Sequence, residues 1–287
     1  MAAIPLEALN AHTIQSFYNS LIRGSEKKKP LSAKTVKNIH GVLHKALKQA
    51  VLNGYIRHNP ADSCTLPRRK KPEIHPFTES EVAAFVKEIE GHRFEELFVT
   101  ALFSGVREGE ILGLTWDHVD FQQDKILITQ QMQLHQEKGA KGYVLDSTKN
   151  DRGRAVTVAP TVMSALRQRR LKQTEDRLLA GAAWENEMNL VFTNELGRCL
   201  TKPTVYRAFK KAAASIGRPD ARFHDLRHTF ATLSLHSGDD IKTVQENLGH
   251  ATAAFTLDIY AHATNQMKRE SAARMESFIQ RISAQYG

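Results

Sequence analysis

Residues 223–230 read Phe-His-Asp-Leu-Arg-His-Thr-Phe, and this stretch sets the interpretation of the rest of the chain. His224 and Arg227 lie three positions apart, so on a helix they share one face and can point at one substrate. Asp225 favours a helix start here, because a carboxylate suits the unpaired N–H groups and the positive end of the helix dipole. The stretch therefore predicts a helix that presents a histidine and an arginine to a common target.

The residues that follow supply further polar groups near helix ends. A second short helix is expected to begin at residues 239–240 and to end at Leu248, with Gly249 in the left-handed position after it. His250 then emerges just beyond a helix end, and Tyr260 lies at the edge of a last short helix. Five side chains here suit phosphoryl transfer: His224, Arg227, His228, His250 and Tyr260.

The motif His-Asp-Leu-Arg-His-Thr-Phe, the Leu-Gly-His at 248–250 and a tyrosine ten residues after that histidine resemble the C-terminal signature of the tyrosine recombinases, the phage integrase family. The stretch is especially similar to integrases of conjugative transposons. A lone His-x-x-Arg is a weak signal, whereas three pieces in this order and spacing are a strong one. The resemblance implies a mainly α protein with a small β-sheet and hairpin, arranged as a two-domain, C-shaped clamp on DNA.

The domain organisation follows from the same resemblance. It implies a helical core-binding domain over residues 1–66, a basic proline-rich linker over 67–76, and a catalytic domain with a C-terminal helix over 77–287. The 287 residues are enough for two domains. Members of the family usually have an earlier helix in the first domain, and many carry an arm-binding domain before it. The sequence begins inside the core-binding pattern, so we expect an N-terminally truncated chain that lacks the arm-binding domain.

The composition favours an anionic partner in a reducing compartment. A net charge of +9 is typical of proteins that bind nucleic acid, although many basic proteins do not. Cys64 and Cys199 lie far apart and form neither a metal motif nor a disulfide framework. The sequence has no apolar run long enough to span a bilayer and no secretory pattern at its start. We therefore expect no membrane association and a nucleoid-associated protein of the bacterial cytoplasm.

The charged side chains of residues 27–58 are all basic. Ser32 is a good cap for a long amphipathic helix over residues 33–52, and residues 27–58 contain no acidic residue. A solvated face usually mixes both signs, so a face of one sign indicates an external anion; the alternative is an ordinary charged surface. The predicted DNA contacts are Lys27, Lys28, Lys29, Lys34, Lys37, Lys45, Arg68, Arg69, Lys70 and Lys71, with Lys210 and Lys211 on a later helix.

Residues 104–110 read Ser-Gly-Val-Arg-Glu-Gly-Glu and resemble the first arginine motif of the family. Gly105 permits a tight turn before Arg107. The resemblance implies that Arg107 is the first catalytic arginine and that Glu110 supports the active site. The alternative for Arg107 is an ordinary surface arginine.

Lys149 is expected at the tip of a β-hairpin, after a glycine-rich turn at 139–142. The hairpin would pair strand residues near 143–147 with those at 154–158. The position resembles that of the family's β-hairpin lysine, which can reach a DNA groove and donate a proton. The alternative is an ordinary turn lysine.

The resemblance also implies the chemistry. Two arginine forks, Arg107 and Arg227, would bind the scissile phosphate, and Tyr260 would attack it. His224 would accept a proton or hydrogen-bond the phosphate, His250 would bond a non-bridging oxygen, and Lys149 would protonate the departing 5′ oxygen. The product is a 3′-phosphotyrosine, which conserves the bond energy, so no cofactor, metal or ATP is expected. A zinc site at the paired histidines of the signature is disfavoured by the adjacent arginine.

Two alternatives stay open beside the recombinase. One is a catalytically silent DNA-binding protein with the same basic clamp, and the other is a type IB topoisomerase. The expected partners are double-stranded DNA at element ends and at target or circular-intermediate sites, and an accessory DNA-bending or excision factor. A tetramer on DNA would exchange its C-terminal helices, unless each helix folds onto its own domain.

Overall fold

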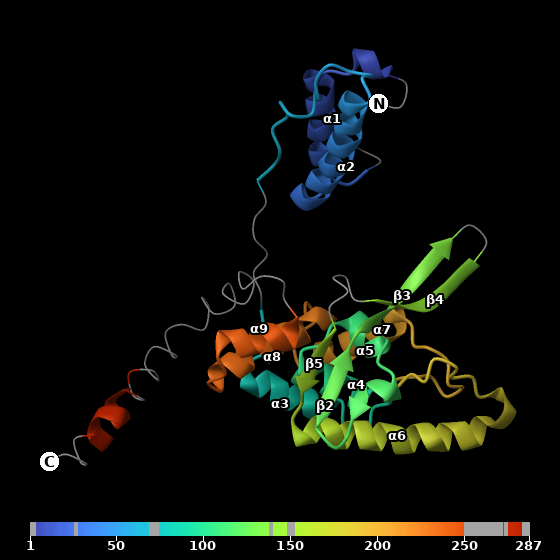
Figure 1. The fold of residues 1–287 in the computed structure, drawn as a ribbon, viewed down its shortest axis with the longest axis vertical. Coiled ribbons are helices and arrows are strands. Elements are labelled where there is room, and N and C mark those ends of the chain that lie inside the picture. The colour runs from blue at the N-terminus through green and yellow to red at the C-terminus, as the bar shows by residue number, and fades with distance from the viewer. Residues whose placement is uncertain are drawn as a thin grey trace. The chain divides into compact units, whose positions relative to one another are not determined.

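The structure is a computed structural model of the sequence, and it describes residues 4–25, 28–68, 75–137, 140–147, 153–249, 272 and 275–282. The chain divides into two compact units, Met1–Glu73 and Ile74–Gly287 (Figure 1). Each unit has a hydrophobic core of its own.

The first unit is helical in its described residues, and its α-helices start at the side-chain caps Asn10 and Ser32. Its elements are the 3-10 turn η1 (Leu6–Ala8) and the helices α1 (Ala11–Arg23) and α2 (Ala33–Leu52). Ser32 accepts a hydrogen bond from the Thr35 N–H, which confirms the helix predicted over residues 33–52. Its core is small and consists of Ile14, Tyr18, Val36, Leu47 and Ala61.

The second unit is mainly helical. Its helices are α3 (Glu79–Glu88), α4 (Glu95–Ser104), α5 (Glu108–Leu112), α6 (Pro160–Ala180), α7 (Lys202–Ser215), α8 (Phe223–His236) and α9 (Ile241–Leu248), with 3-10 turns η2 (Trp116–His118) and η3 (Gly181–Ala183). Helix α4 packs against both α6 and α8. Its Phe98 contacts Phe85, Phe209 and Phe223 edge-on or tilted, so one aromatic cluster joins α3, α4, α7 and α8.

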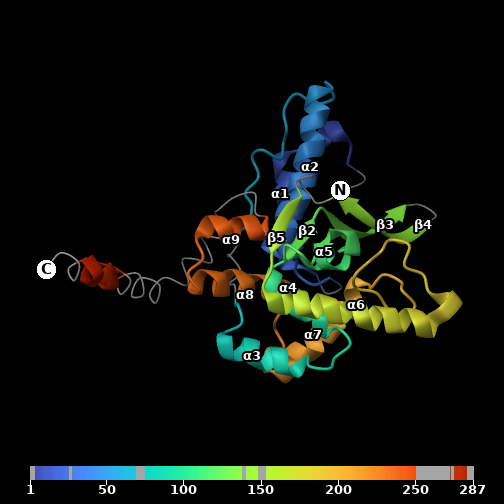
Figure 2. The same ribbon diagram turned by 60° about the horizontal axis from the view of Figure 1, so that its bottom comes forward.

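Two small antiparallel sheets accompany these helices. One has the order β1 (Val119–Asp120), β2 (Lys125–Ile128), β5 (Arg154–Thr157), and the other pairs β3 (Gln130–Glu137) with β4 (Ala140–Ser147). In the first sheet Ile126 lies opposite Val156, and both are buried. The β3–β4 ribbon projects from the body of the unit (Figures 1 and 2).

The predicted hairpin around Lys149 is wrong in its pairing. Strand β4 pairs with β3 and strand β5 pairs with β2, so the segment between them joins two sheets. The predicted glycine-rich turn is also wrong at its C-terminal end, because Gly142 lies within β4 opposite His135. The strand that the prediction missed is rich in glutamine, which masked its alternation of polar residues with Met132 and Leu134. Lys149 itself lies outside the described residues.

Helices α8 and α9 follow the prediction from the signature stretch. The Asp225 carboxylate accepts from the Arg222 N–H at the start of α8, and Asp240 caps α9. Gly249 ends α9 in the left-handed conformation, with φ of 63°. The two helices lie side by side (Figures 1 and 2) over a small core of Ala231, Leu235, Val244 and Leu248.

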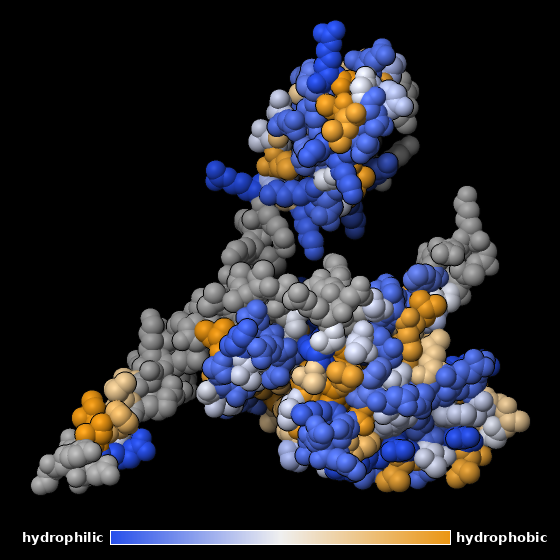
Figure 3. All heavy atoms as spheres, viewed as in Figure 1, coloured by the Kyte–Doolittle hydropathy of each residue, from blue (hydrophilic) through white to orange (hydrophobic). Residues whose placement is uncertain are grey.

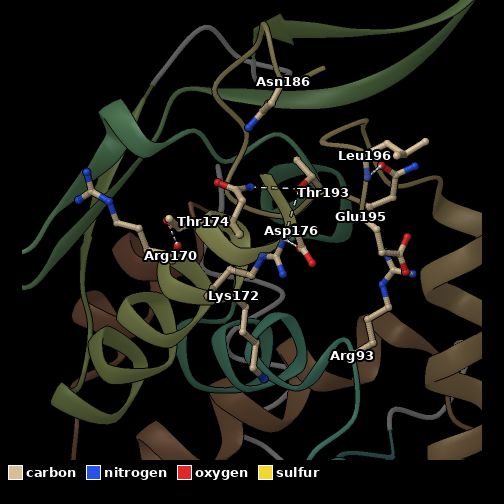
Figure 4. Close-up of polar contacts among 12 residues, drawn as sticks. Arg93, Arg170, Lys172, Thr174, Asp176, Asn186, Thr193, Glu195 and Leu196 are labelled. Atoms are coloured by element: carbon tan, nitrogen blue, oxygen red, sulfur yellow. Dashed lines mark hydrogen bonds and ion pairs between the residues drawn. The ribbon is translucent and has the colours of Figure 1, made fainter. Parts of the chain in front are cut away.

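A buried polar network fixes α6 against the loop that follows it (Figure 4). Gln173 accepts a hydrogen bond from the Trp116 indole at 2.7 Å and donates to the Leu190 carbonyl at 2.9 Å. Both Gln173 and Arg169 also donate to the Thr193 hydroxyl. Since buried polar groups need partners, this network specifies how α6, η2 and the loop pack.

The last described segment, residues 275–282, is helical. Its apolar side chains are exposed and gather on the helix (orange in Figure 3): Met275, Phe278, Ile279 and Ile282. The described helices include none with the length and apolar character needed to cross a bilayer.

Candidate active site

Arg107 and Glu110 meet at the start of α5. Gly105 ends α4 in the left-handed conformation, with φ of 65°, and turns the chain into Arg107. The Arg107 N–H donates to Glu110 Oε2 at 2.9 Å, and its Nη1 donates to Oε1 at 2.6 Å. The Glu110 side chain is 2% exposed, whereas that of Arg107 is 39% exposed. Arg107 is therefore anchored on one side and open on the other.

Arg154, at the start of β5, binds the same carboxylate. Its Nη1 and Nη2 donate to Glu110 Oε1 and Oε2 at 3.0 and 2.6 Å. Burial would raise the pKa of Glu110, but the hydrogen bonds and charges of Arg154 and Arg107 lower that pKa to about 2. Sequence reasoning missed Arg154. Its position beside Gly153, before a β-branched run, is the only signal in the sequence, and that signal does not place Arg154 against Glu110.

Arg227 connects the two arginine-bearing motifs. It is 2% exposed and donates from Nη1 to the Gly105 carbonyl at 2.6 Å and from Nη2 to the Leu248 carbonyl at 2.5 Å. Among the described residues its Nε has no hydrogen-bond partner. The site holds several positive side chains close together. Burial and the nearby charge of Arg107 therefore lower the pKa of Arg227.

The end of α9 is the meeting point of these arginines. Three consecutive carbonyls accept one hydrogen bond each, from three different elements: Asn247 from Arg154, Leu248 from Arg227 and Gly249 from Arg107. The last carbonyls of a helix lack partners within the helix and carry the negative end of its dipole, so guanidinium groups suit them. The fold thereby gathers three positive side chains at one helix end.

His224 lies beside these arginines on α8. Its side chain is exposed, but its ring packs edge-on against buried His228, with centroids 4.7 Å apart. Partial desolvation of the ring and the charges of Arg227 and Arg107 lower the pKa of His224 to about 4. It is therefore neutral near pH 7 and can accept a proton or a hydrogen bond.

The structure thus brings Arg107, Glu110, His224 and Arg227 together. Of the other predicted catalytic residues, Lys149, His250 and Tyr260 lie outside the described residues, and their roles stay predictions. Within the ranges that the structure describes, no three histidine, cysteine or carboxylate side chains gather into a metal site.

The predicted DNA-contacting residues differ in their surroundings. Those that are described and exposed are Lys28, Lys29, Lys34, Lys37, Lys45, Arg68 and Lys211. Lys210 is half-buried and donates to the carbonyls of Pro219 and Ala221, so its ammonium holds the turn before α8. Lys27, Arg69, Lys70 and Lys71 lie outside the described residues.

Comparison with known proteins yields two family matches and many relatives. The description "Phage integrase family" matches residues 75–267, and "Phage integrase SAM-like domain" matches residues 1–66. A tyrosine recombinase XerC-like protein of Caldanaerobacter subterraneus is 32% identical over 89% of this chain and 68% of its own length. The ICEBs1 integrase of Bacillus subtilis is 26% identical over 87% and 67%. The chain spans about two thirds of the length of these curated relatives.

Solved structures show the same fold. The Tn1549 transposon integrase in complex with transposon right end DNA has a TM-score of 0.75 at 23% identity, covering 95% of this chain and 87% of that one. The XerH site-specific recombinase bound to its palindromic difH substrate has a TM-score of 0.68 at 21% identity, covering 93% and 73%.

Proposed function

The chain belongs to the phage integrase family, and we propose that it is a tyrosine-type site-specific DNA recombinase that excises and integrates a mobile element. The observation that carries the proposal is the convergence of Arg107, Arg227 and neutral His224 at the end of α9. In the sequence, His250 follows Gly249 directly and Tyr260 lies ten residues after His250. A merely DNA-binding protein has no need of a buried carboxylate that orients arginines.

In the proposed reaction the arginines bind the scissile phosphate. Arg107 has an open side, and Arg227 keeps three of its five N–H donors after the two carbonyl bonds. A planar fork with permanent charge spreads the negative charge that repels a nucleophile. Because Arg227 is 2% exposed, DNA binding has to open a path to its guanidinium.

The Tyr260 hydroxyl attacks the phosphorus, forms the tyrosine–phosphate bond and breaks the bond to the 5′ oxygen. Neutral His224 takes the tyrosine proton or hydrogen-bonds the phosphate, His250 bonds a non-bridging oxygen, and Lys149 protonates the departing 5′ oxygen. Rejoining reverses these steps. The covalent intermediate conserves the phosphodiester energy, so neither ATP nor a metal enters the scheme.

The DNA partners are the element ends and the target or circular-intermediate sites. The first unit and the lysines of α2 would bind the duplex as a core-binding domain, and the second unit would carry catalysis. Four protomers would hold two duplexes, and the exposed apolar face of residues 275–282 suits exchange between protomers. An accessory DNA-bending factor and a bacterial cytoplasmic location complete the proposal.

The test is covalent capture of DNA. The protein is incubated in chelator with duplexes that carry a randomised segment and a nick, so that the cut fragment diffuses away and the adduct persists. Denaturant-resistant adducts are recovered, the DNA is sequenced, and the modified peptide is mapped. An adduct on Tyr260, absent from Tyr260→Phe, is expected.

Retained DNA binding without any adduct would overturn the recombinase and favour the silent DNA-binding protein. Relaxation of supercoiled plasmid without dependence on site would favour the type IB topoisomerase instead.

A further inference from the structure

We propose that Arg154 is a positioning residue that holds Arg107 and the end of α9 in the arrangement needed for strand cleavage, acting through Glu110. The inference rests on the proposed recombinase function and assigns part of its site. Arg154 makes no contact with the reacting phosphate in this scheme. It fixes the residues that do.

The first observation is that one buried carboxylate serves two arginines. Glu110 Oε1 accepts from Arg107 Nη1 at 2.6 Å and from Arg154 Nη1 at 3.0 Å, while Oε2 accepts from Arg154 Nη2 at 2.6 Å. Arg154 is 11% exposed and Glu110 is 2% exposed. With the Arg154 fork in place, the carboxylate cannot rotate away from Arg107.

The second observation is that Arg154 also reaches α9. Its Nε donates to the Asn247 carbonyl at 2.8 Å, two residues before the Gly249 carbonyl that accepts from Arg107. One planar side chain therefore ties β5 to both α5 and α9. A lysine has a single point of charge and cannot satisfy the two oxygens of Glu110 and the Asn247 carbonyl in this geometry.

The third observation is that the chain leaves room for this side chain. A Cβ built on Gly249 would lie 2.9 Å from Arg154 Cδ and 3.0 Å from its Nη1. Those Arg154 atoms are held by three hydrogen bonds and cannot easily move aside. Arg154 thus leaves room only for glycine at position 249, and its contact with the end of α9 positions that end relative to Arg107.

The experiment compares Arg154→Lys and Arg154→Met with the wild type, using the duplex recovered by covalent capture. Arg198→Met is the matched control, because Arg198 is an exposed arginine paired with exposed Glu185. Both Arg154 variants are expected to bind this duplex as tightly as the wild type and to cleave it about 100-fold more slowly in a single turnover, because a misplaced Arg107 no longer meets the phosphate. Arg198→Met should match the wild type in both.

A sulfur-substituted duplex identifies the route of the effect. A 5′-bridging sulfur departs as a thiolate, whose acid has a pKa of about 8.5, so it needs no proton from Lys149. If Arg154 acts through Arg107, the cleavage defect persists on the sulfur duplex. Rescue of Arg154→Lys by sulfur would overturn the proposal and place its effect on the general acid. With Arg107→Lys in the background, Arg154→Lys should slow cleavage little further.

The pH profile separates positioning from general loss of structure. The charged groups that face Glu110 are Arg107 at the start of α5, Arg154 from β5 and Arg227 from α8. In Arg154→Met the largest opposing charge is gone while burial remains, so the pKa of Glu110 rises above its value in the wild type. As pH is lowered, cleavage by this variant should therefore begin to fall at a higher pH than cleavage by the wild type.

The outcomes distinguish the two proposals. If the wild type forms no adduct, the recombinase itself fails. If the wild type forms an adduct and Arg154→Lys cleaves at the same rate, the recombinase stands and the positioning role is wrong. If both variants lose DNA binding and the folded circular dichroism spectrum together, Arg154 is a folding residue and the positioning role is also wrong.

Discussion

His224 and His228 pack edge-on in α8, and each has a pKa lowered to about 4, His228 chiefly through burial of its ring. In the unfolded chain a histidine has a pKa of about 6.5, so the unfolded state takes up protons first as pH falls. The folded protein should lose stability between about pH 6.5 and pH 4, while above pH 6.5 these rings are neutral in both states.

Replacing buried His228 with asparagine should flatten this loss. We expect the free energy of unfolding of the wild type to fall by roughly 1–3 kcal/mol more than that of His228→Asn across the window. Denaturant titrations at several pH values measure it. The lowered pKa of Glu110 adds its own loss, but only at more acidic pH. Parallel curves for the two proteins would contradict the assignment of the effect to His228.

Gly249 and Gly91 form a matched pair of left-handed glycines. Both have positive φ, 63° and 72°, but a Cβ would meet Arg154 at Gly249 and nothing within 4 Å at Gly91. Replacing either with alanine should cost about 1–2 kcal/mol for the backbone conformation, and Gly249→Ala should cost about 1–3 kcal/mol more for crowding. Thermal unfolding measures both costs. Equal losses of stability in the two variants would show that the Arg154 side chain moves aside without cost.

At this scale the sequence motifs pointed to four residues that the structure brings together, and they gave no sign of Arg154, which joins them. Short sequence motifs contain these four residues, so each could be found without the fold: Arg107, Glu110, His224 and Arg227. Arg154 lies opposite Glu110 only because β5 pairs with β2 and because α9 ends beside it. Such a contact exists only after folding.

Among the helices, α2 has an unusual exposed glycine in its middle. A Cβ on Gly41 would meet nothing within 4 Å, and Lys37 and Lys45 lie one turn away on either side, both exposed. Gly41→Ala should raise the free energy of unfolding by about 0.5–1 kcal/mol, because alanine favours a helix interior. It should also weaken DNA binding if this face approaches the duplex closely.

The control is Ala46→Gly, at an exposed position of the same helix. It should lower the free energy of unfolding by a similar amount and leave DNA affinity unchanged. Chemical denaturation and fluorescence anisotropy with the captured duplex measure the two quantities. Equal DNA affinity for Gly41→Ala and the wild type would show that this face of α2 does not lie close to the duplex.

The helices were predicted better than the strands. Caps such as Ser32 and Asp240 mark helix starts in the sequence itself, and both cap the expected helices. The pairing of β5 with β2 joins segments that are distant in the chain. The polar face of β3 hid its alternation, so the sequence prediction joined β4 to β5 across Lys149, whereas each pairs elsewhere.

For the molecule as a whole, the net charge of +9 should govern DNA affinity. Binding that releases counterions from the duplex makes the logarithm of the binding constant fall linearly with the logarithm of salt concentration. Replacing exposed Lys34, Lys37 and Lys45 together with glutamine should make that slope shallower by about 0.9 for each DNA phosphate that these side chains no longer neutralise. A slope equal to that of the wild type would exclude these lysines from the DNA interface.

The close approach of Arg154 to Gly249 also limits how these two positions can vary among related proteins. A side chain at the position of Gly249 would collide with Arg154, so Gly249 is constrained for as long as the arginine is present. Across relatives, a larger residue at the position of Gly249 should be accompanied by a shorter one at the position of Arg154, and by an altered acid where Glu110 stands. The history of the family would then record this pairing as substitutions that arrive together.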